Sequence, residues 1–225
     1  MHNLVLQSYG DEVQYRRAIL TVLSFCACVG DSLKKYRIFL FTDNIPYFKN
    51  YFADFEINYL PLDEARISEW MGERHFLHRM KIALIAEVFK IADGHLLYVD
   101  TDCFFTGDPT HRMENLDPQS SGMHKREYVF DQLSNLPLLA GMESRTFYAG
   151  VIGQEFLLPG GGKIEIKSSL SSWNAGILLL HKEHASYLTE VFSLTDQFYR
   201  LTGNHASEQF AFSQRPSFHR RRCLL

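Results

Sequence analysis

The sequence has little that would place it in a membrane, on nucleic acid or in a disulfide scaffold. No stretch approaches the roughly 18 consecutive apolar residues that a membrane-spanning helix needs. The formal net charge of −3 provides no global positive field for nucleic acid. The N-terminal residues lack the charged-then-apolar layout of a signal peptide. The four cysteines are scattered along the chain, so we expect free thiols in a cytoplasmic protein.

The chain has 225 residues, of which 46% are hydrophobic and 14% aromatic. That supply of apolar side chains is sufficient for one substantial core, and the length does not demand two independent domains. We therefore expect a single domain over residues 1–225. The net charge is compatible with small acidic or phosphorylated ligands, because a local basic patch can bind them.

Strand-like apolar runs alternate with helix-period stripes in the first half of the chain. Strands are predicted at residues 4–6, 36–42, 55–60 and 95–99, and helices at 13–26 and 75–91. This alternation, with near-continuous apolar strands, predicts an α/β domain with a mostly parallel sheet flanked by helices. Ligands of such sheets bind beyond the carboxyl ends of the strands, where residues 8–11, 42–44 and 100–103 should meet.

The second half of the chain is less regular. Residues 105–170 predict a loop-rich region with some antiparallel pairing, followed by a strand at 174–180 and a helix at 184–201. The run Gly160-Gly161-Gly162-Lys163 fails the phosphate-loop pattern, because neither Ser nor Thr follows the lysine. A flexible hairpin or lid is the better interpretation of these glycines.

Two carboxylates follow the predicted strand at 95–99. Asp100 and Asp102 lie at i and i+2, so they share one side of an extended chain. At the end of a buried strand they repel each other unless a cation or a proton lies between them. A hard divalent ion such as Mn²⁺ or Mg²⁺ suits oxygen ligands of this kind and leaves coordination positions for a diphosphate. An ordinary acidic loop that caps a following helix is the alternative.

A group of basic residues lies at or near the start of the predicted 75–91 helix: Arg74, His75, His78, Arg79 and Lys81. His75 and Arg79 are four residues apart and should share a helix face. The same holds for His78 and Lys81, which are three apart. Positive side chains near a helix N-terminus oppose the macrodipole, which favours a role as anion contacts. A solvated basic face is the alternative.

Two further segments carry polar residues that suit a ligand. Asn174 stands beside the small Ala175 before a predicted strand, where a ligand can approach the backbone closely. Glu208 and Gln209 follow the predicted 184–201 helix and place a carboxylate beside an amide. Neither segment identifies a function alone, since each would be ordinary as the start of a strand or the end of a helix.

Together these segments resemble the GT-A glycosyltransferases, in particular family 8, the group of glycogenin and galactosyltransferases. The matching stretches follow the family's order and approximate spacing: residues 4–25, 79–104, 173–180 and 208–209. The most specific of them is the block that runs from Lys81 into the Asp100-Thr101-Asp102 triplet. The resemblance implies a GT-A domain with a nucleotide-binding half at 1–104 and a sugar and acceptor half at 105–225.

The resemblance also implies a nucleotide-sugar donor, usually a UDP-sugar, and an acceptor that the motifs do not identify. Mn²⁺ or Mg²⁺ would bridge Asp100 and Asp102 to the diphosphate. By position, the residues expected at the donor are Gln7, Ser8, Tyr9, Tyr15, Lys81, Asp100, Thr101, Asn174 and Ala175. Lys81 would also stabilise the leaving diphosphate. Glu208 and Gln209 match the family's usual Asp-Gln pair and would contact the reactive face of the sugar.

The end of the chain departs from the family pattern. Members usually carry a further histidine near the C-terminus that completes the metal site, and His219 is the remaining candidate here. It follows Gln209 closely, with no strand-like segment between them, so we expect a truncated or rearranged C-terminus. Family 8 enzymes retain the anomeric configuration. A non-catalytic relative that binds nucleotide-sugars is the alternative to such an enzyme.

Two other enzyme classes share parts of this pattern. Phosphatases of the haloacid dehalogenase type use a first Asp as nucleophile and a second as acid and base. They carry that motif near the N-terminus and need a downstream acidic pair, whereas the motif here lies at position 100. A sugar-1-phosphate nucleotidyltransferase needs a Gly-rich, basic loop after the first strand, which residues 8–11 do not supply. The residues therefore favour both classes less than a glycosyltransferase.

Overall fold

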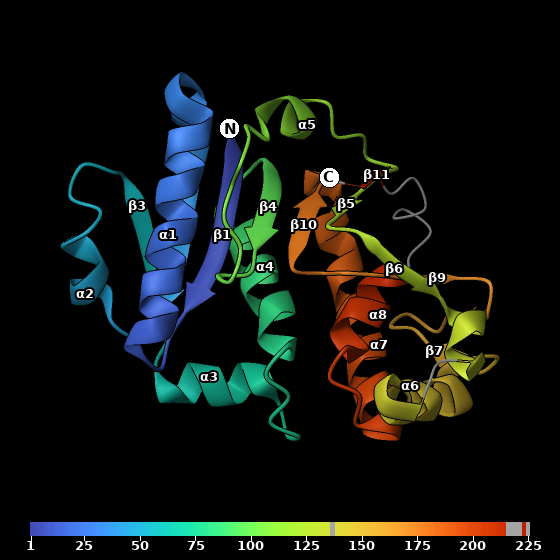
Figure 1. Cartoon of the computed structure of the whole chain (residues 1–225). Coiled ribbons are helices and arrows are strands. Elements are labelled where there is room, and N and C mark those ends of the chain that lie inside the picture. The colour runs from blue at the N-terminus through green and yellow to red at the C-terminus, as the bar shows by residue number, and fades with distance from the viewer. Residues whose placement is uncertain (136–137, 215–221, 224–225) are drawn as a thin grey trace.

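The protein, described by a computed structural model over residues 1–135, 138–214 and 222–223, is built around one large sheet (Figure 1). Within these residues the sheet has seven strands in the order β11-β5-β10-β4-β1-β2-β3. Their bounds are β1 (His2–Ser8), β2 (Tyr36–Thr42), β3 (Ile57–Pro61), β4 (His95–Val99), β5 (Gly122–Met123), β10 (Ile177–Leu180) and β11 (Arg222–Cys223). Neighbours pair in parallel except β10, which runs antiparallel to β4 and β5. The predicted α/β class with a mostly parallel sheet is confirmed.

Helices cover both faces of the sheet (Figure 1). They are α1 (Glu12–Val29), α2 (Ile45–Lys49), α3 (Glu64–Met71), α4 (Arg79–Ile91), α5 (Thr110–Glu114), α6 (Leu138–Val151), α7 (Leu188–Thr202) and α8 (Ser207–Ser213). Short 3₁₀ segments are η1 (Gly30–Lys35), η2 (Phe130–Asn135) and η3 (Lys182–Tyr187). No helix in the described part of the chain is long and apolar enough to cross a membrane.

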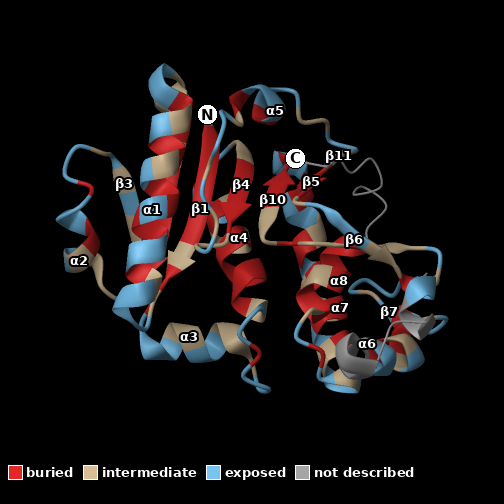
Figure 2. Ribbon diagram, in the orientation of Figure 1, coloured by how far each residue is buried: buried red, intermediate tan, exposed pale blue. Residues whose placement is uncertain are grey.

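Successive residues of the central strands pack into two different cores. Val5 belongs to the core that α4 and α7 share, whereas Leu4 and Leu6 pack with residues of α1. All three are fully buried, and full burial of such a side chain contributes about 1.5–3 kcal/mol. Because the strands are buried on both faces (Figure 2), their sequences are unbroken apolar runs rather than alternating ones.

Helix α1 confirms the helix predicted at 13–26. Asp11 is its N-cap and accepts a hydrogen bond from the N–H of Gln14 at 3.0 Å. Gly30 follows the last residue with φ of 49°, in the left-handed region that favours glycine. These two residues set where α1 begins and ends.

The helix predicted at 75–91 begins later, at Arg79. His75 has a φ of 49°, and residues 72–78 form a turn that leads from α3 into α4. The prediction that His75 and Arg79 share a helix face is therefore wrong. Helix α3 was missing from the predicted elements, although Asp63 caps it by accepting a hydrogen bond from the N–H of Arg66 at 2.8 Å.

The second half contains the antiparallel pairs expected between residues 105 and 170. Strand β6 (Arg126–Val129) pairs with β9 (Ser171–Trp173), and β7 (Glu155–Leu157) pairs with β8 (Lys163–Glu165). Gly160 and Gly161 take φ values of 93° and 88° in the turn between β7 and β8, which confirms a hairpin. Strand β10 starts three residues later than predicted, and the predicted 184–201 helix is η3 followed by α7.

Four histidines contact one another in a row at the opposite end of the central strands, where β1 and β4 begin. The histidine cluster comprises His2, His95, His181 and His184. The ring centroids of His95 and His181 are 4.4 Å apart. Burial lowers the pKa of all four imidazoles, and that of His95 falls to about 4. The packed form of the cluster is therefore the neutral one.

Candidate functional site

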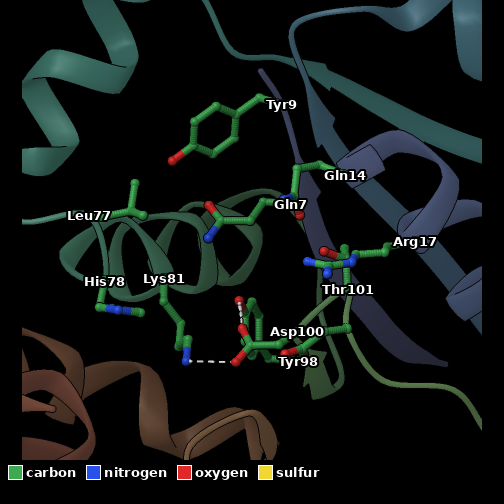
Figure 3. Close-up of a pocket in the computed structure, with 11 residues that line it drawn as sticks. Gln7, Tyr9, Gln14, Arg17, Leu77, His78, Lys81, Tyr98, Asp100 and Thr101 are labelled. Atoms are coloured by element: carbon green, nitrogen blue, oxygen red, sulfur yellow. Dashed lines mark hydrogen bonds and ion pairs between the residues drawn. The ribbon is translucent and has the colours of Figure 1, made fainter. Parts of the chain in front are cut away.

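A pocket of about 390 Å³ opens at the carboxyl ends of β1 and β4, between the first turns of α1 and of α4 (Figure 3). Its lining is Gln7, Tyr9, Gln14, Arg17, Leu77, His78, Lys81, Tyr98, Asp100, Thr101 and Asp102. The loops that follow parallel strands converge at this edge of a sheet, so ligands of α/β proteins bind there. The volume lies within the range of small-molecule sites, about 300–1,000 Å³.

Lys81 is the centre of a buried polar cluster on one wall of the pocket. Its Nζ donates to Glu208 Oε1 at 3.1 Å and to Asp100 Oδ2 at 3.3 Å. It also donates to the carbonyl oxygen of Ala175 at 3.1 Å. The Lys81 side chain is only 4% exposed, and its contacts with Glu208 and Ala175 are buried, whereas Asp100 is partly open to the pocket. Residues from α4, α8, the segment after β4 and the segment before β10 thus meet at one ammonium group.

The surroundings of this ammonium keep it charged. Burial lowers the pKa of Lys81, but the carboxylates of Asp100 and Glu208 outweigh burial and raise that pKa to about 12. Tyr98 is fully buried and donates to Asp100 Oδ1 at 2.5 Å. Burial, and then the Asp100 charge, raise the pKa of Tyr98 well above its ordinary value. A neutral phenol and a charged amine therefore hold the two oxygens of Asp100 in a fixed orientation.

Asp102 presents its carboxylate on the open side of this cluster. It is exposed, and its one side-chain hydrogen bond among the described residues is a weak one from the Cys103 thiol, 3.6 Å long. No group of three His, Cys, Asp or Glu side chains within residues 1–135, 138–214 and 222–223 could hold a metal by itself. The carboxylate pair nevertheless fits Mg²⁺ or Mn²⁺, which bind one or two carboxylates and fill other positions with water and phosphate oxygens. His219, the predicted third ligand, lies outside the described residues.

The residues predicted from the first strand and helix separate into two groups. Gln7 and Tyr9 line the pocket, and the buried Oε1 of Gln7 has no hydrogen-bond partner in the described part of the chain. Ser8 is buried and does not line it. Tyr15 donates its hydroxyl to Asp43 Oδ1 at 2.8 Å, and burial raises the pKa of Tyr15 to about 12. Tyr15 therefore ties α1 to the residue that follows β2, and it does not line the pocket.

A second polar cluster joins Asn174 and Gln209 through Glu127, a residue that no motif had indicated. The Glu127 carboxylate accepts a hydrogen bond from Gln209 Nε2 at 2.6 Å and one from Asn174 Nδ2 at 3.2 Å. Ser172 Oγ donates to it at 3.3 Å. Gln209 Oε1 in turn accepts from the N–H of Ala175, 3.4 Å away. Glu127 thus fixes which way both amide groups face.

The two polar clusters adjoin each other at the backbone of residues 174–176. The Ala175 carbonyl belongs to the first cluster and its N–H to the second. A Cβ on Gly176 would lie 3.0 Å from Asn174 Oδ1 and 3.2 Å from Asp100 Oδ2. Only a residue without a side chain fits between these two oxygens without pushing one of them aside.

No protein-family model and no curated protein matches the sequence. Solved structures match the fold. Mouse xyloside xylosyltransferase 1, in its apo form, gives a TM-score of 0.58 at 13% identity, covering 99% of this chain and 84% of that one. The galactosyltransferase LgtC, in complex with donor and acceptor sugar analogs, gives 0.61 at 11% identity, covering 94% and 70%. The Mn/GDP form of core-mannan synthase A from Aspergillus fumigatus gives 0.50 at 13% identity, covering 98% and 72%.

The chain has the GT-A glycosyltransferase fold. This GT-A fold brings eight of the predicted site residues to one edge of the sheet, either in the pocket lining or in contact with it: Gln7, Tyr9, Lys81, Asp100, Thr101, Asp102, Ala175 and Glu208. Asn174 and Gln209 lie in the adjoining cluster. Glu208 and Gln209 follow the predicted 184–201 helix, but on a helix of their own, α8.

The basic group separates within the GT-A fold. His78 and Lys81 line the pocket. Arg79 faces away, because its Nε donates to Asp196 Oδ1 at 2.7 Å, and it borders a different cavity together with Arg74. The interpretation as a joint anion contact is therefore wrong for Arg79. The sequence showed only that these basic residues lie close together near the start of a helix. It did not show which of them face the pocket, because consecutive residues of a helix point in different directions.

Proposed function

We propose that the chain is a glycosyltransferase that takes a sugar from a nucleotide-sugar donor, a UDP-sugar in the first place, with Mn²⁺ or Mg²⁺. The observation that supports this most directly is the buried, charged Lys81 that holds Asp100 beside the open carboxylate of Asp102. Two similar structures favour the same chemistry, because LgtC was solved with donor and acceptor sugar analogs and core-mannan synthase A with Mn and GDP.

The charges of the site favour a cation. Lys81 carries one positive charge against the carboxylates of Asp100 and Glu208. Asp102 and Arg17, which also line the pocket, add one charge of each sign, so the carboxylates still outnumber the cations. Asp100 and Asp102 would hold the divalent ion, which, when bound, would supply a Lewis acid for the diphosphate. His219 remains part of this proposal as a further ligand.

Lys81 would act in two ways during transfer. As the bond between sugar and diphosphate breaks, negative charge develops on the leaving diphosphate, and a preorganised ammonium nearby stabilises that charge without reorganising. Lys81 would also keep the Asp100 carboxylate oriented throughout. The sugar becomes oxocarbenium-like, and Gln209 and Asn174, fixed by Glu127, would meet it on the side of α8. Retention of configuration would follow from the resemblance to family 8.

We further propose that residues 1–104 hold the nucleotide and residues 105–225 the sugar and acceptor. Gln7, Tyr9 and Thr101 would contact the nucleoside from the pocket lining. Ser8 and Tyr15 would support them from the buried side. The GT-A fold disfavours the phosphatase alternative, whereas a relative that binds nucleotide-sugars without transferring sugar is a distinct outcome of the test below.

The proposal is tested by thermal unfolding with UDP-sugars and GDP-sugars, with and without Mn²⁺. We expect a nucleotide-sugar to raise the unfolding temperature only when Mn²⁺ is present, and Asp102→Asn to abolish that rise. Asp54→Asn is the matched control, because Asp54 is also exposed but does not border the pocket. Equal stabilisation without metal, or none by any nucleotide-sugar, would contradict the proposal.

A second measurement separates an enzyme from a binding protein. Release of free UDP from the stabilising UDP-sugar, either to water or to added sugar acceptors, is expected for the wild type and not for Asp102→Asn. Binding that depends on Mn²⁺ without UDP release under any condition would identify the non-catalytic relative. Release of inorganic phosphate from a phosphomonoester would instead favour the phosphatase.

A further inference from the structure

The face of α1 that meets the loop after β4 carries a stripe of polar residues. Its members follow at intervals of three and four, so they share one side of the helix: Gln14, Arg17, Thr21 and Ser24. Thr21 Oγ1 donates to the carbonyl oxygen of Cys103 at 2.6 Å and lies 3.2 Å from that of Thr101. Ser24 Oγ accepts from the N–H of Phe105 at 3.0 Å. These bonds fix the register of α1 against the carboxylate loop.

Arg17 lies one helical turn before Thr21 and is therefore set beside Thr101. Its guanidinium points into the pocket near Thr101, and Asp102 borders the same space (Figure 3). Within the described part of the chain, the Arg17 side chain makes no ion pair and no hydrogen bond. An arginine has five N–H donors, and those of Arg17 are available to a ligand of the pocket.

The charges around the pocket show which kind of ligand suits Arg17. Lys81 is already engaged with two carboxylates, so its charge is largely offset before a ligand binds. Among the described lysine and arginine residues that line the pocket, Arg17 is the one without a carboxylate partner. A diphosphate brings several negative charges, and the planar guanidinium can bind two phosphate oxygens at once.

We propose that Arg17 binds the phosphate groups of the donor nucleotide and makes the pocket prefer nucleoside diphosphates over nucleosides. This inference rests on the proposed function and adds a phosphate-binding residue from α1, on the wall opposite Lys81. Arg17 would contact the phosphates directly, whereas Lys81 also holds Asp100. The carboxylate pair and Arg17 would then bind the diphosphate from one pocket edge, through the metal and through hydrogen bonds respectively.

The neighbouring arginine provides a matched control. Arg16 is on the same helix and is exposed, as Arg17 is. Its guanidinium donates to Glu12 at 2.8 Å, and it does not border the pocket. Calorimetric titration with UDP, GDP and uridine, each with Mn²⁺, would compare the wild type with Arg17→Ala, Arg17→Lys and Arg16→Ala. Thermal unfolding without ligand would verify that the variants fold.

We expect Arg17→Ala to lower the affinity for the diphosphate that the wild type binds by about tenfold to a hundredfold. The affinity of Arg17→Ala for uridine should stay unchanged, and Arg16→Ala should bind the diphosphate like the wild type. The diphosphate affinity of Arg17→Lys should fall between those of the wild type and Arg17→Ala, because lysine keeps the charge but lacks the planar guanidinium that binds two oxygens at once. Unchanged diphosphate affinity in Arg17→Ala would overturn the inference and leave the proposed function standing. So would an equal loss for uridine. A wild type that binds neither diphosphate would overturn both.

Discussion

Replacing Lys81 by methionine should destabilise the protein mainly because it leaves the Glu208 carboxylate buried without its cation. The Glu208 side chain is 5% exposed, and Lys81 Nζ lies 3.1 Å from it. The rise of the Lys81 pKa from 10.5 to about 12 corresponds to about 2 kcal/mol. Methionine removes more than the charge, because a neutral amine could still donate a hydrogen bond and methionine cannot. Removing one partner of a buried ion pair costs about 3–5 kcal/mol.

The double variant Lys81→Met/Glu208→Gln separates the effect of charge from that of packing. With glutamine at 208 no buried carboxylate lacks a cation there, so the double variant should be more stable than Lys81→Met by at least about 2 kcal/mol. Glu208→Gln alone should cost less than Lys81→Met, because Lys81 keeps Asp100 as its partner.

Urea unfolding at pH 8, followed by tryptophan fluorescence, measures these free energies. The pKa of Lys81 is raised in the folded state, so the contribution of the pair is complete below pH 10.5 and is lost as pH rises through about 12. The exposed pair Lys163–Glu155 is the control, and Lys163→Met should change stability by less than about 1 kcal/mol. A double variant as unstable as the sum of its single variants would refute the reasoning.

Three further predictions concern other parts of the fold. Gly94→Ala should lower the free energy of unfolding in urea by about 3 kcal/mol or more. Gly94 has φ of 115°, and an added Cβ would lie 2.1 Å from the Met1 carbonyl oxygen. Gly107→Ala is the control and should be nearly neutral, because a Cβ there would meet open space. Glu127→Gln should lower the rate of UDP release about tenfold without changing unfolding. The Gln209 and Asn174 amides each donate to one carboxylate oxygen of Glu127, and glutamine replaces one of these oxygens by an NH2 group that cannot accept. An unchanged rate would contradict this role. The histidine cluster has lowered pKa values, so its contribution to stability is complete above pH 6.5 and is lost as pH falls toward about 4. His95→Gln should reduce this loss of stability at acid pH, as measured by the free energy of unfolding from pH 7.5 to 4.5.

The central strands were predictable from sequence because each is buried on both faces and therefore leaves an unbroken apolar run. The carboxylates of Asp100 and Asp102 stood out for the same reason, as the polar residues that end such a run. Lys81 was indicated by the basic group and by the resemblance, and its partner Glu208 is 127 residues away. A spacing of that size carries no local signal, so the ion pair itself could not be predicted.

Other functional candidates were missed for different physical reasons. Glu127 lies on a short strand in a segment without clear periodicity, 82 residues from Gln209. Arg17 looks like an ordinary solvated residue of an amphipathic helix, and only the polar stripe that it shares with Thr21 marks its face. The start of α4 was misplaced because a left-handed backbone at His75 is not visible in its residue type.

Strand β10 has a consequence for the growing chain. Strand β4 pairs with β1 on one side, but its other edge stays open until residues 177–180 are made and pair with residues 96–99. At about 5–20 residues per second, the roughly 80 residues between them take on the order of 4–16 seconds to synthesise. During that time an apolar strand exposes unpaired N–H and C=O groups, which can recruit another chain. A fragment that stops before β10 should therefore aggregate, and chaperones that shield exposed strand edges should bind nascent chains of that length.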